Sequence, residues 1–426
     1  MNRVIGIHQF KPDKVWKWKL LEQKMAQVLS LHDYQEIRLS VLQDYTEIVE
    51  GITALMHEDE ATQATEGIVS LSPSDGNLSL LTLRPEGTIS VLHYTAQIVK
   101  DSDVHRFYYI GPMFRKGKES LPSEFHQLGV ELLGSAAVVS ENEVISLGVK
   151  ICQQLGLRDV KLQLNSFGCQ DCRPHFFEDL HSFLKEHESE LCADCFRKLS
   201  TNPFADTGCT NSKCKAVYQE GPMVLDYLCQ SCRRNFSKVK KIQANLAHQY
   251  IVNPKLFKNF AYYNETVFDF VIKVNGQEQV IGGGGRYDYL SRMITGKNIP
   301  AVGFYLNIDS IFETMERRGL FMSPDKDFSV FISTQSEDLD MMLLQIAQEL
   351  HDNNIKTVLS TDKHSITDDI ALAQKAQCEL MLVIRDENVR EGKLLMRDLI
   401  KEHQDYIKLD GIIDAILLAR KSLNKE

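Results

Sequence analysis

The chain has 426 residues, of which 48 are basic and 58 acidic, so its formal net charge is −10. At roughly 100–200 residues per domain, this length suggests two to four domains, each able to bury a core. No apolar run approaches the ~18 residues of a membrane-spanning helix, and residues 1–19 lack the apolar region and cleavage site of a secretory signal. The sequence therefore predicts a cytoplasmic protein with no membrane partner. Its acidic balance argues against a surface made mainly for nucleic acid.

The first 164 residues combine helical spacing of apolar side chains with strand-like segments, and residues 236–323 continue the same pattern. The predicted elements are a helix at 14–31, an extended segment at 35–41, strands at 106–115 and 124–134, a helix at 141–155, a strand at 161–165, and strands at 266–274, 279–282 and 301–306. We interpret 1–164 and 236–323 as one core, interrupted by an insertion over residues 165–235.

The insertion carries eight of the ten cysteines, in four closely spaced pairs. The pairs are Cys169 and Cys172, Cys192 and Cys195, Cys209 and Cys214, and Cys229 and Cys232. In a reducing cytoplasm such pairs are typical of zinc ligands, because two intervening residues let both sulfurs reach one tetrahedral ion. We expect two structural four-cysteine zinc sites, and the sequence leaves open which pairs combine. The alternative is that the cysteines are buried without a metal.

The last hundred residues show a different pattern. After a plausible linker at 324–327, strands and helices alternate over residues 327–426, which predicts a small α/β domain. This segment has 12 basic and 19 acidic residues, a net charge of −7. Since affinity for nucleic acid depends on neutralising phosphates, such a domain disfavours nucleic acid as a partner. A local basic patch on an acidic domain is the alternative.

Four segments carry the residues of chemical interest: TLRPEGT at 82–88, YYIGPMFR continuing to SEFHQLGVELLG within 108–134, YYNETVFDF at 262–270, and VIGGGGRYDYL with AVGFYLNIDS within 280–310. Together they resemble the catalytic domain of histidyl-tRNA synthetases, a family of class II aminoacyl-tRNA synthetases. The resemblance extends over nearly the whole chain, including the insertion and the C-terminal unit, which resembles an anticodon-binding domain. The net charge of −7 on that unit disfavours tRNA as its partner. The resemblance implies an α+β fold, in which helices flank an antiparallel sheet, and a homodimer.

The resemblance also implies a histidine pocket beside a nucleotide site. Free histidine offers an ammonium, a carboxylate and an imidazole, so its site needs acceptors, a cation and a shaped polar wall. The histidine-binding candidates are Glu86, Thr88, Gln127, Glu131, Tyr262 and Tyr263. The nucleotide-binding candidates are Arg115, Gly283, Gly284 and Arg286. Arg115 matches the arginine that holds the α-phosphate of ATP, where a fork of donors suits phosphate oxygens.

Three positions depart from the family pattern. Lys258 replaces an arginine that assists activation of the amino acid, and lysine lacks the planar bidentate contact. Ala261 replaces an aspartate, and Ser310 replaces an arginine that clamps the γ-phosphate. Because adenylylation depends on electrostatic clamping of phosphates, such losses are expected to slow it strongly.

These departures favour a catalytically silent paralogue that binds histidine. The example in this family is the regulatory subunit of ATP phosphoribosyltransferase, the first enzyme of histidine biosynthesis, whose partner is the catalytic phosphoribosyltransferase subunit. The segment 122–125 resembles that subunit, whereas the cysteine pairs resemble those of true synthetases. Two alternatives stay open. One is an active histidine–tRNA ligase that uses ATP and Mg²⁺, with Arg115 and Lys258 in catalysis. The other is a non-catalytic scaffold on this fold.

Overall fold

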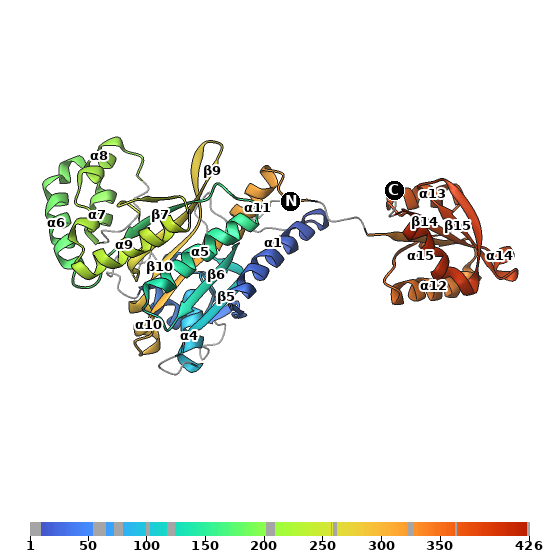
Figure 1. Cartoon of the computed structure of the whole chain (residues 1–426), viewed down its shortest axis with the longest axis horizontal. Coiled ribbons are helices and arrows are strands. Elements are labelled where there is room, and N and C mark those ends of the chain that lie inside the picture. The colour runs from blue at the N-terminus through green and yellow to red at the C-terminus, as the bar shows by residue number, and fades with distance from the viewer. Residues whose placement is uncertain are drawn as a thin grey trace. The chain divides into compact units, whose positions relative to one another are not determined.

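The structure is a computed structural model that divides the chain into two compact units, Met1–Phe321 and Met322–Glu426 (Figure 1). It describes residues 10–53, 65–71, 80–98, 103–116, 124–201, 209–256, 258, 262–322, 327–362 and 364–423. Within these ranges, no helix combines the length and the apolar character that crossing a membrane requires.

The first unit is built on an eight-stranded sheet with the order β1-β5-β6-β11-β10-β9-β7-β8. Its strands are β1 (Gln35–Glu36), β5 (His105–Phe114), β6 (Glu124–Leu133), β7 (Lys161–Ser166), β8 (Tyr250–Val252), β9 (Asn264–Val274), β10 (Gln277–Arg286) and β11 (Ala301–Asn307). The edge strands β1 and β8 pair in parallel with their neighbours, and every other pair in this sheet is antiparallel. The predicted antiparallel α+β core is confirmed.

Helices cover both faces of this sheet. On one face the core forms against α1 (Pro12–Leu31), α5 (Val138–Gln154), α9 (Gln230–Asn245) and α11 (Ile308–Arg317). The other face packs against α2 (Tyr45–Thr53), α4 (Thr88–Ile98) and α10 (Asp288–Thr295). A small antiparallel sheet with the order β2-β4-β3 lies before α4, and its strands are β2 (Leu42–Asp44), β3 (Ser70–Leu71) and β4 (Leu81–Leu83).

The alternation of side chains along β6 decides which residues reach each face. Leu128, Val130 and Leu132 point into the core under α1 and α5. Because successive side chains in a strand point to opposite faces, Gln127 and Glu131 share the other face, where both are buried. The strand thus presents two polar side chains toward α4.

The insertion leaves the sheet after β7 and returns through α9. Between them lie α6 (Arg173–Glu186), the 3₁₀ turn η1 (Glu188–Glu190), α7 (Ala193–Thr201), α8 (Ser212–Glu220) and the 3₁₀ turn η2 (Val224–Tyr227). The predicted boundary at residue 235 falls inside α9, a continuous helix whose Phe236 and Val239 pack into the core of the first unit.

The second unit is a five-stranded sheet with the order β13-β12-β14-β15-β16. Its elements are β12 (Ser329–Thr334), η3 (Glu337–Leu339), α12 (Asp340–Asp352), β13 (Lys356–Leu359), α13 (Ile366–Lys375), β14 (Leu380–Ile384), α14 (Asp386–Arg390), β15 (Lys393–Asp398), β16 (His403–Lys408), η4 (Leu409–Gly411) and α15 (Ile412–Leu423). The strands β12, β13 and β14 are parallel, as the predicted alternation of strands and helices requires. The antiparallel hairpin β15–β16 was not predicted.

Candidate functional site

A cavity of about 390 Å³ lies in the first unit, on the face of the sheet that packs against α4. Side chains of β5, β6, β9, β10 and β11 line it, together with the segment that precedes α4. The cavity brings together Glu86, Thr88, Arg115, Gln127, Glu131, Lys258, Tyr262 and Tyr263. Residues from five separate parts of the sequence therefore meet in a space large enough for an amino acid.

Glu86 is buried at the start of α4, where its carboxylate caps the helix. The backbone N–H groups of Thr88 and Ile89 donate to its two oxygens, over 2.7 and 2.8 Å. These bonds satisfy donors that the first helical turn leaves without partners. Burial raises the pKa of Glu86, although the two backbone bonds oppose that shift. The side chain is thereby held in one orientation at the cavity.

Glu131 lies deeper in the cavity, and its oxygens accept bonds from two hydroxyls. Thr88 Oγ1 donates over 2.8 Å, and Tyr287 Oη donates to the other oxygen. Burial raises the pKa of Glu131 to about 8, so the carboxyl group keeps its proton at neutral pH in the absence of a ligand. Gly303 leaves the necessary room, since a Cβ there would lie 1.8 Å from Glu131 Oε2.

Five tyrosines line the cavity, and four of them lie near these carboxyl groups: Tyr109, Tyr262, Tyr263 and Tyr287, whereas the fifth is Tyr305. The ring centroids of Tyr262 and Tyr263 lie 4.8 Å apart. Burial raises the pKa of all four hydroxyls, so they stay protonated and offer hydrogen bonds inside the cavity. Tyr109, Tyr287 and Tyr305 were not predicted as site residues. All three lie in the four segments of chemical interest, but nothing in those segments separates a wall residue from a core residue.

Two cations line the same cavity. The Arg115 guanidinium lies 5.0 Å from the centre of the Phe125 ring, and its Nε donates to the carbonyl of Pro85 over 3.0 Å. Lys258 is 8% exposed, and its ammonium donates to the carbonyl of Phe268 over 2.8 Å and to the Asp269 carboxylate. The cavity thus combines buried acids with positive charge, as a zwitterionic ligand requires.

The glycines of β10 make room for neighbouring groups. A Cβ on Gly283 would lie 2.0 Å from Asp269 Oδ1 and 2.6 Å from Lys258 Nζ. A Cβ on Gly284 would lie 2.0 Å from the carbonyl oxygen of Gly303 on β11. Both glycines are therefore explained by packing around the ion pair and between strands. Neither is among the residues that line the cavity.

Arg286, expected to bind nucleotide, lies in a buried ion-pair network away from the cavity lining. It is 2% exposed, and its Nε donates to Glu141 of α5 over 2.7 Å. Its Nη1 donates to Asp288 over 3.2 Å. Two carboxylates already neutralise this guanidinium inside the protein, which gives Arg286 a role in joining β10, α5 and α10. The sequence did not single out Glu141, which also accepts from Thr266 Oγ1.

Of the other positions that depart from the family pattern, the structure describes Ser310 but not Ala261. Ser310 lies in the first turn of α11, where its backbone N–H donates to the Asn307 side chain over 2.9 Å. Asn307 lines the cavity, but Ser310 does not. Ala261 and the segment 122–123 lie outside the described residues.

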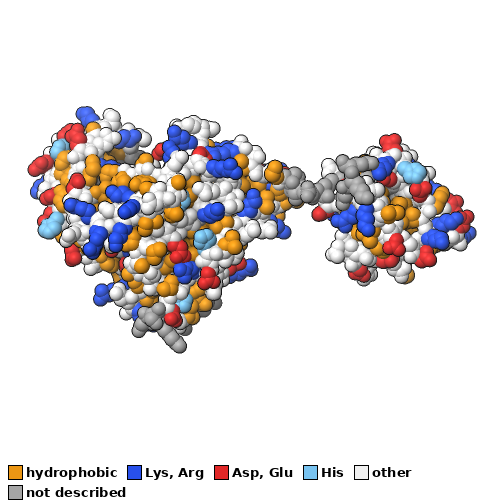
Figure 2. Space-filling view, viewed as in Figure 1, with side chains coloured by type: hydrophobic (Ala, Val, Ile, Leu, Met, Phe, Trp, Pro, Cys, Tyr) orange, Lys and Arg blue, Asp and Glu red, His pale blue; other side chains and the backbone are white. Residues whose placement is uncertain are grey.

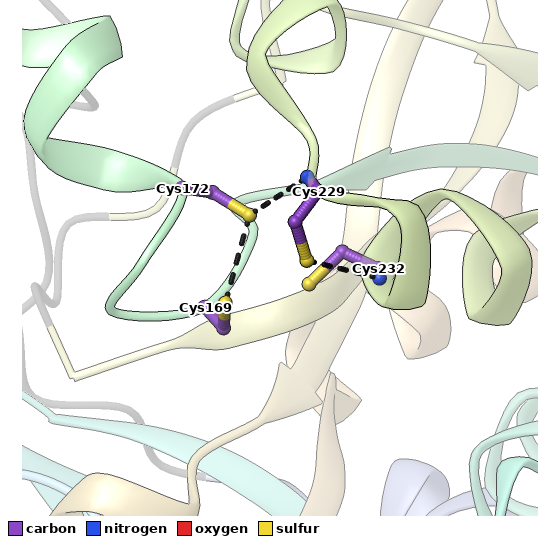
Figure 3. A group of neighbouring side chains, drawn as sticks. All are labelled: Cys169, Cys172, Cys229 and Cys232. Atoms are coloured by element: carbon purple, nitrogen blue, oxygen red, sulfur yellow. Dashed lines mark hydrogen bonds between the residues drawn. The ribbon is translucent and has the colours of Figure 1, made fainter.

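The eight cysteines of the insertion form two compact groups, each with four sulfurs within 4.8 Å of one another. One consists of Cys169, Cys172, Cys229 and Cys232 (Figure 3), and the other of Cys192, Cys195, Cys209 and Cys214. We call them the outer and the inner cluster, because the first and last pairs along the chain make the outer one. Either cluster could hold a metal ion, and the structure resolves which pairs combine.

The fold is that of a class II aminoacyl-tRNA synthetase, and comparison with known proteins identifies the family. The family model described as histidyl-tRNA synthetase matches residues 6–172 and 209–311, and the one described as anticodon binding domain matches 329–418. A histidine–tRNA ligase of Halothermothrix orenii is 31% identical over 414 residues, which cover 96% of this chain and 97% of the relative. One of Caldicellulosiruptor bescii is 30% identical over 417 residues, with 96% of each chain covered. The chain belongs to the histidyl-tRNA synthetase family.

Solved structures agree on the fold. The apo histidyl-tRNA synthetase of S. aureus gives a TM-score of 0.78 at 22% identity, covering 98% of this chain and 99% of that one. A Bacillus halodurans protein described as an ATP phosphoribosyltransferase regulatory subunit/histidyl-tRNA synthetase gives 0.61 at 17% identity, covering 90% and 97%. At these identities the likeness extends to the fold alone.

The prediction of an ATP phosphoribosyltransferase regulatory subunit is wrong. Relatives that match this chain over nearly its whole length are histidine–tRNA ligases. The prediction treated Lys258 and Ser310 as lost phosphate contacts, but the Lys258 side chain still lines the cavity, as Arg115 does. The charge of the second unit was also given too much weight, because an anticodon-binding model matches that unit.

Proposed function

We propose that this protein is a histidine–tRNA ligase, which activates the carboxylate of histidine with MgATP and transfers the histidyl group to the 3′ end of tRNA. The ligases that match 96% of the chain support this activity. The observation that carries the proposal is the cavity itself, where the buried carboxyl groups of Glu86 and Glu131 and a tyrosine wall lie together with Arg115 and the Lys258–Asp269 ion pair.

Both the ammonium and the imidazole of histidine have matching groups in this cavity. The ammonium is placed against Glu86 and Glu131, with Gln127 and Thr88 as further polar partners. The imidazole is placed against Tyr262 and Tyr263. Because Glu131 holds a proton near neutral pH, a bound ammonium favours its charged form, and we expect histidine binding to release a proton.

Activation joins the histidine carboxylate to the α-phosphate of ATP and expels pyrophosphate. Arg115 neutralises charge that develops on the α-phosphate. Lys258 also lines the cavity, where its ammonium is paired with the Asp269 carboxylate. Mg²⁺ enters with ATP, because this ion binds mainly through substrate phosphates, and it neutralises the leaving pyrophosphate. The adenylate then reacts with a hydroxyl of the tRNA terminus, and AMP leaves.

Histidine-dependent exchange of pyrophosphate into ATP tests the first step, and charging of histidine tRNA tests the second. We expect both in the native protein. Arg115→Ala should lower exchange by about 100-fold or more, with histidine binding in calorimetry changed by less than about threefold. Native protein that binds histidine but supports no exchange would contradict the ligase proposal.

For the partners, we propose histidine, MgATP, histidine tRNA and a second copy of the chain, since the family forms homodimers. The helix α9 supports a role for nucleic acid, since it contains Arg233, Arg234, Lys238, Lys240 and Lys241 and no acidic residue. Basic side chains are visible over this part of the first unit in Figure 2.

We also propose that each cysteine cluster holds one zinc ion in a structural role. Zinc favours four thiolates at about 2.3 Å in a tetrahedron, which places the sulfurs about 3.8 Å apart. The sulfurs of Cys169 and Cys172 are 3.6 Å apart, close to that value and far beyond a disulfide bond. Four protein ligands close each site, so neither has an open position for catalysis.

A further inference from the structure

The outer cluster lies where the insertion leaves and rejoins the core. Cys169 and Cys172 belong to the turn between β7 and α6, and Cys229 and Cys232 begin α9 (Figure 3). The backbone N–H of Cys229 donates to the sulfur of Cys172 over 3.1 Å, and that of Cys232 points to the sulfur of Cys229 over 3.5 Å. Such N–H···S contacts orient metal ligands and stabilise thiolates.

The same turn is bonded to the backbone of the tyrosine pair. Arg173, the residue after Cys172, donates from its guanidinium to the carbonyl oxygen of Tyr263. Its Nε donates to the carbonyl of Phe167 over 3.3 Å. One side chain thus connects the cysteine turn to a residue whose ring lines the cavity.

Further bonds attach this turn to the start of β9 and to α10. The backbone N–H of Glu265 donates to the carbonyl of Gly168 over 3.0 Å, and that of Gln170 donates to the Tyr289 hydroxyl over 3.0 Å. Gly168 has φ +64°, and a Cβ there would lie 2.8 Å from the Cβ of Cys172. The turn therefore requires glycine, and its geometry depends on where Cys172 is held.

The inner cluster is placed differently. Its four cysteines lie in and beside α7 and α8, and the backbone N–H of Cys192 donates to the sulfur of Cys214 over 3.2 Å. Among the described residues, none of its recorded hydrogen bonds reaches a side chain that lines the cavity. In the part of the chain that the structure describes, the outer cluster is therefore the one with a neighbouring residue, Arg173, that bonds to the cavity wall.

We propose that zinc in the outer cluster fixes the position of Tyr263 in the histidine pocket, through Arg173 as a positioning residue. The inference rests on the proposed histidine pocket. Four thiolates on one ion fix the turn at 169–172 against α9, and this fixes the base of the Arg173 side chain. Its bond to the Tyr263 carbonyl then sets the tyrosine pair against the imidazole. The inner zinc stabilises the tip of the insertion and does not change the affinity for histidine.

Matched pairs of cysteine variants separate the two clusters. Elemental analysis of native protein purified without chelator should give two zinc ions per chain. The outer variant Cys229→Ser/Cys232→Ser and the inner variant Cys209→Ser/Cys214→Ser should each retain one. In calorimetry, histidine should bind the outer variant at least tenfold more weakly and the inner variant within twofold of native. Absence of zinc from native protein would overturn the proposal. An equal loss of histidine affinity in the two variants would also overturn it.

Variants of Arg173 test the connection without removing a ligand, which covers the case of an outer variant that does not fold. Arg173→Met should keep two zinc ions, raise the histidine KM in pyrophosphate exchange about tenfold and change kcat by less than threefold. Arg173→Lys should restore part of the affinity. Native affinity for histidine in Arg173→Met would overturn the connection. The affinity of Arg173→Met for histidine is also measured by calorimetry, which needs no turnover, so an inactive ligase leaves this test intact.

Discussion

Glu131 differs from a surface glutamate in the pH range over which it ionises. Its pKa is about 8 in the folded protein because of burial, against 4.5 in the absence of the fold. Between these two values the folded state holds a proton that the unfolded state has lost. The free energy of unfolding therefore falls as pH rises from about 4.5 to about 8, and burial of Glu86 acts in the same direction.

Glu131→Gln removes this ionisation and keeps polar contacts with Thr88 and Tyr287. We expect the variant to gain stability relative to native protein as pH rises, by about 3 kcal/mol between pH 5 and pH 8. Urea unfolding at the two pH values measures the change. Glu313→Gln, at an exposed position of α11, is the control and should follow the native protein. An identical pH dependence in Glu131→Gln would contradict the assigned pKa.

The Lys258 and Asp269 pair presents a different problem at the same scale, because both partners are largely withdrawn from water. Removing one partner leaves an uncompensated buried charge. We expect Lys258→Met to lower the free energy of unfolding by about 3 kcal/mol, and Lys258→Met/Asp269→Asn to regain part of it. Denaturant unfolding of native protein, the single variants Lys258→Met and Asp269→Asn, and the double variant gives a double-mutant cycle, which measures the coupling energy of the pair. Additive effects would show that the pair is not coupled.

Among the elements, β6 shows how far a sequence pattern can predict a site. Its alternation places Gln127 and Glu131 on one face, and both line the cavity. Arg286 shows the limit, since its partner Glu141 lies 145 positions away and no local pattern joins them. The strand β16 was missed because most of its side chains are exposed and polar, so no alternation marks it. The pairing of the cysteines likewise needs the fold, which brings the first pair to the last.

The strand β10 depends on close contact with β11. Gly284→Ala would place a Cβ 2.0 Å from the Gly303 carbonyl, which is backbone and has little freedom to move. We expect a loss of about 3 kcal/mol in the stability of the first unit. Gly411→Ala, in the second unit, is the control, since a Cβ there meets nothing within 4 Å, and it should leave the stability of the first unit within about 0.5 kcal/mol of native. Chemical unfolding followed by circular dichroism compares them, and a Gly284→Ala protein as stable as the control would contradict the packing argument.

For the molecule as a whole, the two units have separate hydrophobic cores. The clusters around the large sheet contain no residue of the second unit, whose described core residues gather on the two faces of its own sheet. The proposed histidine pocket belongs entirely to the first unit. Each unit therefore has the apolar interior that independent unfolding requires.

We expect scanning calorimetry to resolve two unfolding transitions, one for each unit. Histidine should raise the midpoint temperature of the first unit's transition only. At a histidine concentration of 100 times Kd, the stabilisation is about 2.7 kcal/mol, which corresponds to a shift of a few degrees. Alanine, which lacks the imidazole, serves as the ligand control. A single transition, or an equal shift of both, would contradict the separation of the units.

The cysteine clusters are nested along the chain, since the inner one is complete at Cys214 and the outer one only at Cys232. With a metal in each, the outer ring encloses roughly 60 residues and the inner roughly 20, so closing the outer ring costs about 1 kcal/mol more in chain entropy. During synthesis from the N-terminus, the tip of the insertion can close while the rest of the chain is still being made. The outer ring closes later, so Arg173 can be fixed against the Tyr263 carbonyl only after the insertion has folded.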